Sequence, residues 1–196
     1  MKVALRIETG TRNEDRAAYY PTKNGALLVI ADGAGNSGQG AAAADRVLAM
    51  ARREAGSARD PGELLTCMDR CIAEDPDAGE TTSVIVILRN QFVHGASVGD
   101  SGAWILARDG VDDLTQGQVR KPLLGSGVAR AVGFGPVALQ GRLLVATDGL
   151  LKYVALETIR ELGLHPDIEQ AATTLCDAAR LADGRLPDDI GLLLVE

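Results

Sequence analysis

The sequence predicts an α+β fold in which antiparallel sheets are covered by helices. Seven short apolar runs, most of them ended by Gly, Asn or Asp, are typical of strands. Four segments with helical periodicity lie between them in two pairs. Strands joined by short turns, with grouped helices, favour antiparallel sheets over a regular strand-helix alternation. A chain of 196 residues suits one domain, which we expect to span 1–196.

The strands are expected where apolar or alternating residues run for four or more positions. In chain order they are Lys2–Ile7, Ala26–Ala31, Ser83–Leu88, Phe92–Val98, Ala103–Ala107, Leu143–Ala146 and Ile190–Val195. Short polar turns between the third, fourth and fifth predict a meander.

The helical patterns fall at Gly40–Glu54, Pro61–Glu74, Ala155–Glu161 and Pro166–Ala182. Pro61 and Pro166 suit the first turn of a helix, where a missing N–H costs nothing. The stretch Gly110–Gly141 is Gly-rich and weakly periodic, and we expect a connecting loop there with room for one short strand.

Composition and charge exclude several classes of partner. The net charge is −7, and Lys and Arg form no basic stripe, so nucleic acid is not expected as a partner. No apolar run approaches the roughly 20 residues of a membrane span, and no membrane partner is expected. The opening "MKVALRIETG" lacks the apolar core of a signal peptide, so we expect a cytoplasmic location. Three cysteines and two histidines form no ligand cluster, which argues against zinc.

The stretch "LLVIADGAGNSGQG" allows two interpretations. Gly33, Gly35 and Gly38 have the spacing of a dinucleotide-binding loop. That loop requires a second strand that ends on an acid about 20 residues later. Here "ARREAGS" continues a charged helix instead, so a nucleotide-binding oxidoreductase is the less favoured interpretation.

Carboxylates stand at the ends of five apolar runs, and this is the stronger signal. They are Asp32, Asp100, Asp148, the pair Asp188 and Asp189, and the pair Glu14 and Asp15. Acids gathered at one end of a sheet raise one another's pKa unless cations are present. Mg²⁺ and Mn²⁺ prefer oxygen ligands, and two such ions can bind hydroxide and phosphate together. The pattern therefore predicts metal-assisted hydrolysis of a phosphate ester.

Six motifs, in this order, resemble those of the PP2C (PPM) family of metal-dependent protein serine/threonine phosphatases, in its compact bacterial type. They are "NEDRAAYY", "LLVIADGAGNSGQGAAAADRVLA", "GETTSVIVIL", "HGASVGDSGAWIL", "LLVATDGLLKYV" and "PDDIGLLLV". The resemblance runs from about Asn13 to Val195. It implies a four-layer α-β-β-α sandwich, two Mg²⁺ or Mn²⁺ ions, and a phosphorylated protein as substrate.

The resemblance also implies roles for individual residues. Asp32 would bridge two metals and Gly33 would offer its carbonyl to one, while Asp148 and Asp188 would complete the second ion's ligands. Glu14 and Asp15 would hold metal-bound waters, and Asp100 would help bind a third, weaker metal. Thr81 and Thr82 match a turn that we interpret as structural. The implied activity is hydrolysis of phosphoserine or phosphothreonine by a metal-bridging hydroxide.

The sequence departs from the family pattern at two positions and in one segment. The family's arginine that binds the substrate phosphate is replaced by Gly10, and either Arg12, two residues later, or Arg6, four earlier, could substitute, with Arg12 favoured for substrate binding. A histidine after the first "DG" is replaced by Ala34. The chain between Asp100 and Asp148 is short, which implies a reduced flap. These departures keep open a pseudophosphatase that acts as a binding or regulatory module.

Overall fold

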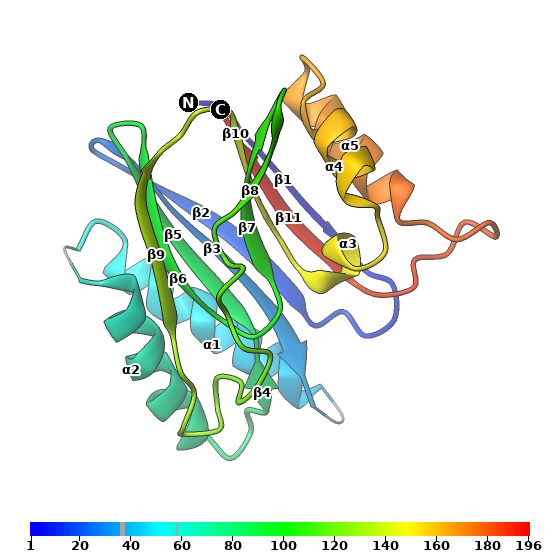
Figure 1. The fold of residues 1–196 in the computed structure, drawn as a ribbon. Helices are drawn as coiled ribbons and strands as arrows, with labels where there is room; N and C mark the ends of the chain where they lie inside the picture. The colour runs from blue at the N-terminus through cyan, green and yellow to red at the C-terminus, as the bar shows by residue number, and fades with distance from the viewer. Residues whose placement is uncertain (36–37, 58) are drawn as a thin grey trace.

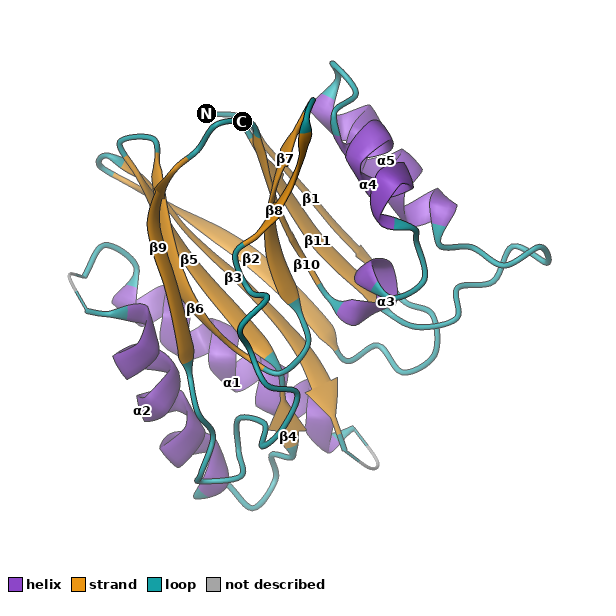
Figure 2. Cartoon of the chain, viewed as in Figure 1, coloured by secondary structure: helices purple, strands orange, loops and turns teal. Residues whose placement is uncertain are grey.

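The computed structural model describes residues 1–35, 38–57 and 59–196. Two antiparallel sheets lie face to face, and helices cover both outer faces (Figure 1, Figure 2). This is the α+β, four-layer α-β-β-α arrangement that the sequence and its family resemblance predict.

The strand orders of the two sheets are as follows. The five-stranded sheet runs β1 (Val3–Glu8), β11 (Ile190–Val195), β10 (Arg142–Ala146), β7 (Gly102–Ala107) and β8 (Gly110–Asp113). The six-stranded sheet runs β2 (Asp15–Thr22), β3 (Gly25–Ala34), β5 (Ser83–Arg89), β6 (Phe92–Val98) and β9 (Val132–Ala138), and β4 (Glu80–Thr81) pairs with β3.

The helices divide between the two outer faces. The pair α1 (Gln39–Glu54) and α2 (Pro61–Ala73) covers the six-stranded sheet, and the pair α4 (Leu156–Gly163) and α5 (Ile168–Ala178) covers the five-stranded one (Figure 1). The short helix α3 (Asp148–Leu151) follows directly on β10. None of the helices in the described ranges combines the length and apolar character that a membrane span requires.

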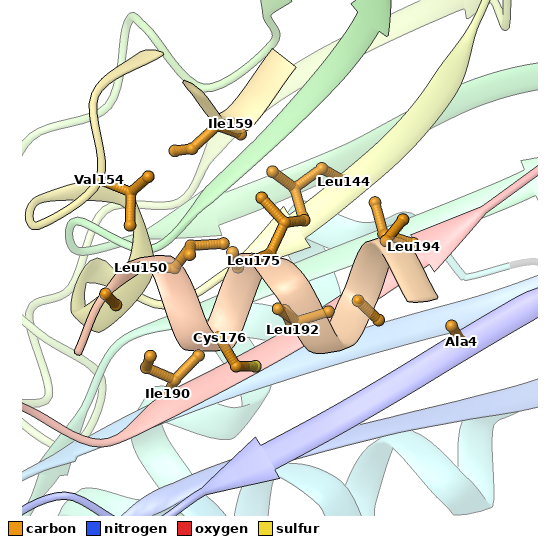
Figure 3. Close-up of a cluster of buried hydrophobic side chains, with 14 of the residues drawn as sticks. Ala4, Leu144, Leu150, Val154, Ile159, Leu175, Cys176, Ile190, Leu192 and Leu194 are labelled. Carbon is orange, nitrogen blue, oxygen red and sulfur yellow. The ribbon is translucent and has the colours of Figure 1, made fainter. Parts of the chain in front are cut away.

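The central strands are buried on both faces, which explains why their sequences are unbroken runs of apolar residues. In β3, Leu28 and Ile30 pack into the layer between the sheets, while Leu27 and Val29 pack under α1 and α2. In strands β10 and β11 too, successive side chains point alternately into the layer between the sheets and toward the helices outside. Their outward residues, among them Leu144, Leu192 and Leu194, surround Leu175 of α5 (Figure 3).

All seven expected strands form, but the structure differs from the prediction in several places. Gly110–Gly141 contains two strands, β8 and β9, where room for one was expected. Strands β2 and β4 and the short helix α3 were not expected. Helix α5 begins at Ile168, because Asp167 caps it by accepting the N–H groups of Glu169 and Gln170. Pro61 does occupy the first turn of α2, after the Asp60 cap.

Candidate metal centre

Three of the predicted acids meet at one end of the sandwich. Asp32 is near the end of β3, Asp100 is in the bend between β6 and β7, and Asp148 is the first residue of α3. One carboxylate oxygen of each lies within 4.8 Å of the others. Residues separated by up to 116 positions therefore form one half-buried acidic cluster.

Asp15 joins this cluster from the neighbouring strand. It is buried, and strand pairing places it directly opposite Asp32. The hydroxyl of Thr147, the residue before Asp148, donates to Asp15 Oδ2 at 2.7 Å. Thr147 also accepts the Gly191 N–H at 2.9 Å, so one buried threonine joins the ends of β2, β10 and β11.

The backbone of Asp32 is held by the two threonines that were interpreted as structural. The Thr81 hydroxyl and the Thr82 N–H both donate to the Asp32 carbonyl, each at 2.8 Å. The Asp32 N–H donates to the Thr82 hydroxyl at 3.2 Å, and that hydroxyl lies 2.6 Å from Ser101 Oγ. These bonds fix the position of Asp32 relative to the bend that carries Asp100, and they agree with the structural interpretation.

The adjacent acids Asp188 and Asp189 have different environments. Asp189 is buried, and its oxygens accept the N–H groups of Gly10, Thr11, Arg12 and Glu14 at 2.7 to 3.2 Å. Burial opposes its ionisation, but these four donors outweigh burial and lower the pKa of Asp189. Asp189 thus anchors the β1–β2 connection. Asp188 is half-buried and lies outside the 4.8 Å group.

The remaining predicted site residues lie around the cluster. Glu14 is buried, and its Oε2 has no hydrogen-bond partner among the described residues. Arg12 Nη1 donates to the Gly35 carbonyl at 3.1 Å and lies 3.9 Å from Glu14 Oε2. A Cβ at Gly33 would lie 2.4 Å from the Gly40 backbone, so only glycine allows the end of β3 to approach α1 this closely.

The carboxylates resist ionisation when no cation is bound. Burial, followed by the charges of Asp15, Asp148 and Asp188, raises the pKa of Asp32 to about 9. Burial also raises the pKa of Asp15 to about 7, although the Thr147 hydroxyl acts against it. The pKa of Asp148 is raised by burial and by the charges of Asp100 and Asp188.

This donor set fits a hard divalent cation. The cluster offers only oxygen ligands, and the carboxylates repel one another unless positive charge is placed between them. Glu14 Oε2, which accepts no hydrogen bond from the described residues and has only the more distant Arg12 guanidinium near it, adds a buried acceptor beside the cluster. The residues that could hold such an ion are Asp32, Asp100 and Asp148, with Asp15 and Asp188 next to them.

A cavity of about 540 Å³ opens onto the cluster. Its walls include the three acids, Ala34 and Gly35, and two cations, Arg120 and Lys121. Arg120 Nε lies 2.7 Å from Asp100 Oδ2. Sequence reasoning missed both cations because they lie in the weakly periodic stretch, where no pattern indicates which side chains turn inward. It missed Thr147 too, although its place before Asp148 in "TDG" was a usable signal.

The fold and the acidic cluster define a class: this is a domain with the PP2C fold. The family model described as Stage II sporulation protein E (SpoIIE) matches residues 22–196, and the chain belongs to that family. No curated protein matches the chain in sequence.

Solved structures with this fold include bacterial serine/threonine phosphatases. Stp1 from Staphylococcus aureus is 20% identical, with a TM-score of 0.84 and coverage of 100% of this chain and 95% of that chain. PstP/Ppp from Mycobacterium tuberculosis is 21% identical, with a TM-score of 0.77 and coverage of 98% and 97%. The PstP catalytic domain in complex with 2 manganese ions is 22% identical, with a TM-score of 0.77 and coverage of 98% and 96%.

Proposed function

We propose that this protein is a Mg²⁺- or Mn²⁺-dependent phosphatase that hydrolyses phosphoserine or phosphothreonine in a protein substrate. The observation that carries the proposal is the convergence of Asp32, Asp100 and Asp148 in one group of oxygen ligands. The two manganese ions of the PstP structure support two ions here.

The proposed ligands are Asp32, the Gly33 carbonyl, Asp148 and Asp188, with Asp100 available to a third, weaker ion. When bound, two such ions supply a bridging hydroxide that is nucleophilic at neutral pH, and they offset charge on the phosphoryl oxygens. Acidic side chains next to the ligands would orient the water molecules bound to the ions. Glu14 Oε2 is a free acceptor for water, and Asp15 is kept in place by Thr147.

Arg12 is proposed to contact the substrate at the cavity rim. Its guanidinium lies against the Gly35 carbonyl, and Gly35 is part of the cavity wall. Most of the Arg12 side chain, 64%, remains exposed and therefore accessible to a phosphoprotein.

A pseudophosphatase remains the second candidate because Gly10 and Ala34 lack the side chains usual in the family. It would bind metal and a partner protein but turn over little substrate. The retention of every proposed carboxylate ligand favours the enzyme. A cytoplasmic location, a single domain over 1–196 and the absence of nucleic acid as a partner remain predictions.

The test is hydrolysis of p-nitrophenyl phosphate and a phosphothreonine peptide, with and without Mn²⁺, by wild type and Asp32→Asn. We expect activity that requires Mn²⁺ and falls by about a thousandfold in the variant, because the ions contribute several kcal/mol to the transition state. Asp109→Asn, an exposed acid in the β7–β8 turn, is the matched control and should retain activity.

Two results would contradict the proposal. Unchanged, metal-dependent turnover by Asp32→Asn would show that the site assignment is wrong. No turnover by wild type that binds Mn²⁺ in calorimetry would favour the pseudophosphatase.

A further inference from the structure

Position 10, where the family pattern has a phosphate-binding arginine, has no room for a side chain. A Cβ at Gly10 would lie 2.2 Å from the Asp188 carbonyl oxygen and 2.5 Å from its carbon. The Gly10 N–H is held by Asp189 at 2.7 Å, which prevents the backbone from moving aside without losing that bond. The replacement of arginine by glycine is therefore built into the packing of the β1–β2 connection.

The cavity wall contains two cationic side chains that could bind the substrate phosphate. Among the described residues that line the acidic cavity, only Arg120 and Lys121 are basic. Arg120 faces the acids, since its Nε lies 2.7 Å from Asp100 Oδ2. Neither terminal nitrogen of Arg120 makes a hydrogen bond within the part of the chain that the structure describes, and 72% of its side chain is exposed. Within the described residues, both terminal nitrogens of this cavity-lining side chain are thus available to a ligand.

The segment that carries Arg120 is fastened on both sides. On one side, Gln118 Nε2 donates to the Ser101 carbonyl at 2.9 Å. On the other, Leu124 and Thr81 exchange backbone hydrogen bonds of 3.0 Å. Asp69 of α2 then accepts the N–H groups of Gly125, Gly127 and Ala129. Arg120 therefore extends from a short span between two fixed points.

We propose that Arg120 binds the phosphoryl group of the substrate, with Lys121 beside it. This inference rests on the proposed function, because it assigns a role in the same site. A guanidinium presents paired donors that match two phosphoryl oxygens, which a lysine cannot reproduce. Asp100 holds Arg120 over the acids through Nε and leaves both terminal nitrogens for the substrate. Arg12, whose guanidinium is engaged by Gly35 and Glu14, has the lesser part.

The test compares Arg120→Ala, Arg120→Lys, Lys121→Ala and Arg12→Ala with Arg130→Ala. Arg130 is an exposed arginine of the same segment outside the cavity wall, so it is the matched control. Three quantities are measured: KM and kcat for a phosphothreonine peptide with Mn²⁺, the Kd of inorganic phosphate for Mg²⁺-loaded protein by calorimetry, and the Kd of Mn²⁺.

For Arg120→Ala we expect KM and the Kd of phosphate to rise by about tenfold or more, since a hydrogen bond to a charged group is lost. Arg120→Lys should recover part of the loss, Arg12→Ala should change both values less than Arg120→Ala does, and Arg130→Ala should stay within twofold of wild type. The affinity for Mn²⁺ should be unchanged or tighter, because Asp100 loses a competing cation.

A phosphate Kd within twofold of wild type in Arg120→Ala would overturn the assignment. So would a loss confined to Lys121→Ala or to Arg12→Ala. Phosphate binding is measured without turnover, so it tests Arg120 even if the wild type proves inactive. Conversely, failure of Arg120→Ala to weaken binding in an active enzyme would leave the phosphatase proposal intact.

Discussion

Gly10 is a point of close contact between two chain segments that are far apart in sequence. Its Cα faces the Asp188 carbonyl, and its N–H, with three others, is satisfied by the buried Asp189 carboxylate. The β1–β2 connection, which leads to Glu14 and Asp15, is therefore positioned by the segment that leads into β11. A side chain at position 10 would separate the two.

Gly10→Ala is expected to destabilise the protein by about 2 kcal/mol, within the range of other overpacked sites. Gly110→Ala is the control, since a Cβ there would have nothing within 4 Å. Urea unfolding of the metal-free proteins measures the change in the free energy of unfolding for both variants. Equal midpoints and slopes for Gly10→Ala and wild type would contradict the close packing at this position.

Three acids of the cluster were predictable residue by residue because each follows an apolar run. Asp32, Asp100 and Asp148 converge as the pattern predicts. The distinction between Asp188 and Asp189 was taken from the family resemblance, and the hydrogen bonds to Asp189 give it a physical basis. Arg120 had no such signal, because its contribution depends on the path of an irregular segment.

At the scale of elements, the connection from β8 to β9 depends on α2 for its shape. Asp69 is 3% exposed and gathers three backbone N–H groups of that connection. Because the connection also carries Arg120, the α2 helix indirectly determines where this cation lies.

Asp69→Ala should lower the free energy of unfolding by about 2–3 kcal/mol, because three N–H groups lose a charged acceptor. It should also raise KM for a phosphopeptide while the affinity for Mn²⁺ stays within twofold, since the acids of the cluster do not contact Asp69. Thr66→Ala, an exposed position on the same helix, provides the comparison. Steady-state kinetics, urea unfolding and calorimetry give the three values. If Asp69→Ala has the KM of wild type, Asp69 does not influence substrate binding through the position of Arg120.

The strands that the sequence did not predict lie at sheet edges or are very short, as is the two-residue β4. Strand β2 contains Pro21, and β9 contains Pro136 and two glycines, which strand patterns exclude but sheet edges tolerate. Strand β8 is only four residues long. The central strands were found because burial on both faces makes them apolar throughout.

At the scale of the whole molecule, unfavourable charge is concentrated at one end of the sandwich. The ordinary pKa of an aspartate is 3.8, whereas Asp15 and Asp32 are raised to about 7 and about 9. The folded, metal-free protein therefore retains protons that the unfolded chain has already released. Stability must fall as pH rises through this interval.

We expect the melting temperature of the metal-free protein to fall between pH 6 and pH 9. Saturating Mg²⁺ should raise the melting temperature at each pH, by more at pH 9, because the cation binds the ionised carboxylates of the folded state. Asp32→Asn should show a weaker dependence on pH. Thermal unfolding in EDTA and in Mg²⁺ measures these effects. A metal-free protein that is more stable at pH 9 than at pH 6 would contradict the raised pKa values.

The acids at this end belong to both layers of the sandwich. Asp15 and Asp32 lie on the six-stranded sheet, whereas Asp148 and Asp188 flank strands of the five-stranded sheet. An ion shared by the two sets would add a cross-link between layers that meet through apolar contacts and, at this end, through the hydrogen bond from Thr147 to Asp15. In its absence the layers should separate first at this end, so amide hydrogen exchange in Thr147 and the start of β2 would report metal loading before any substrate is added.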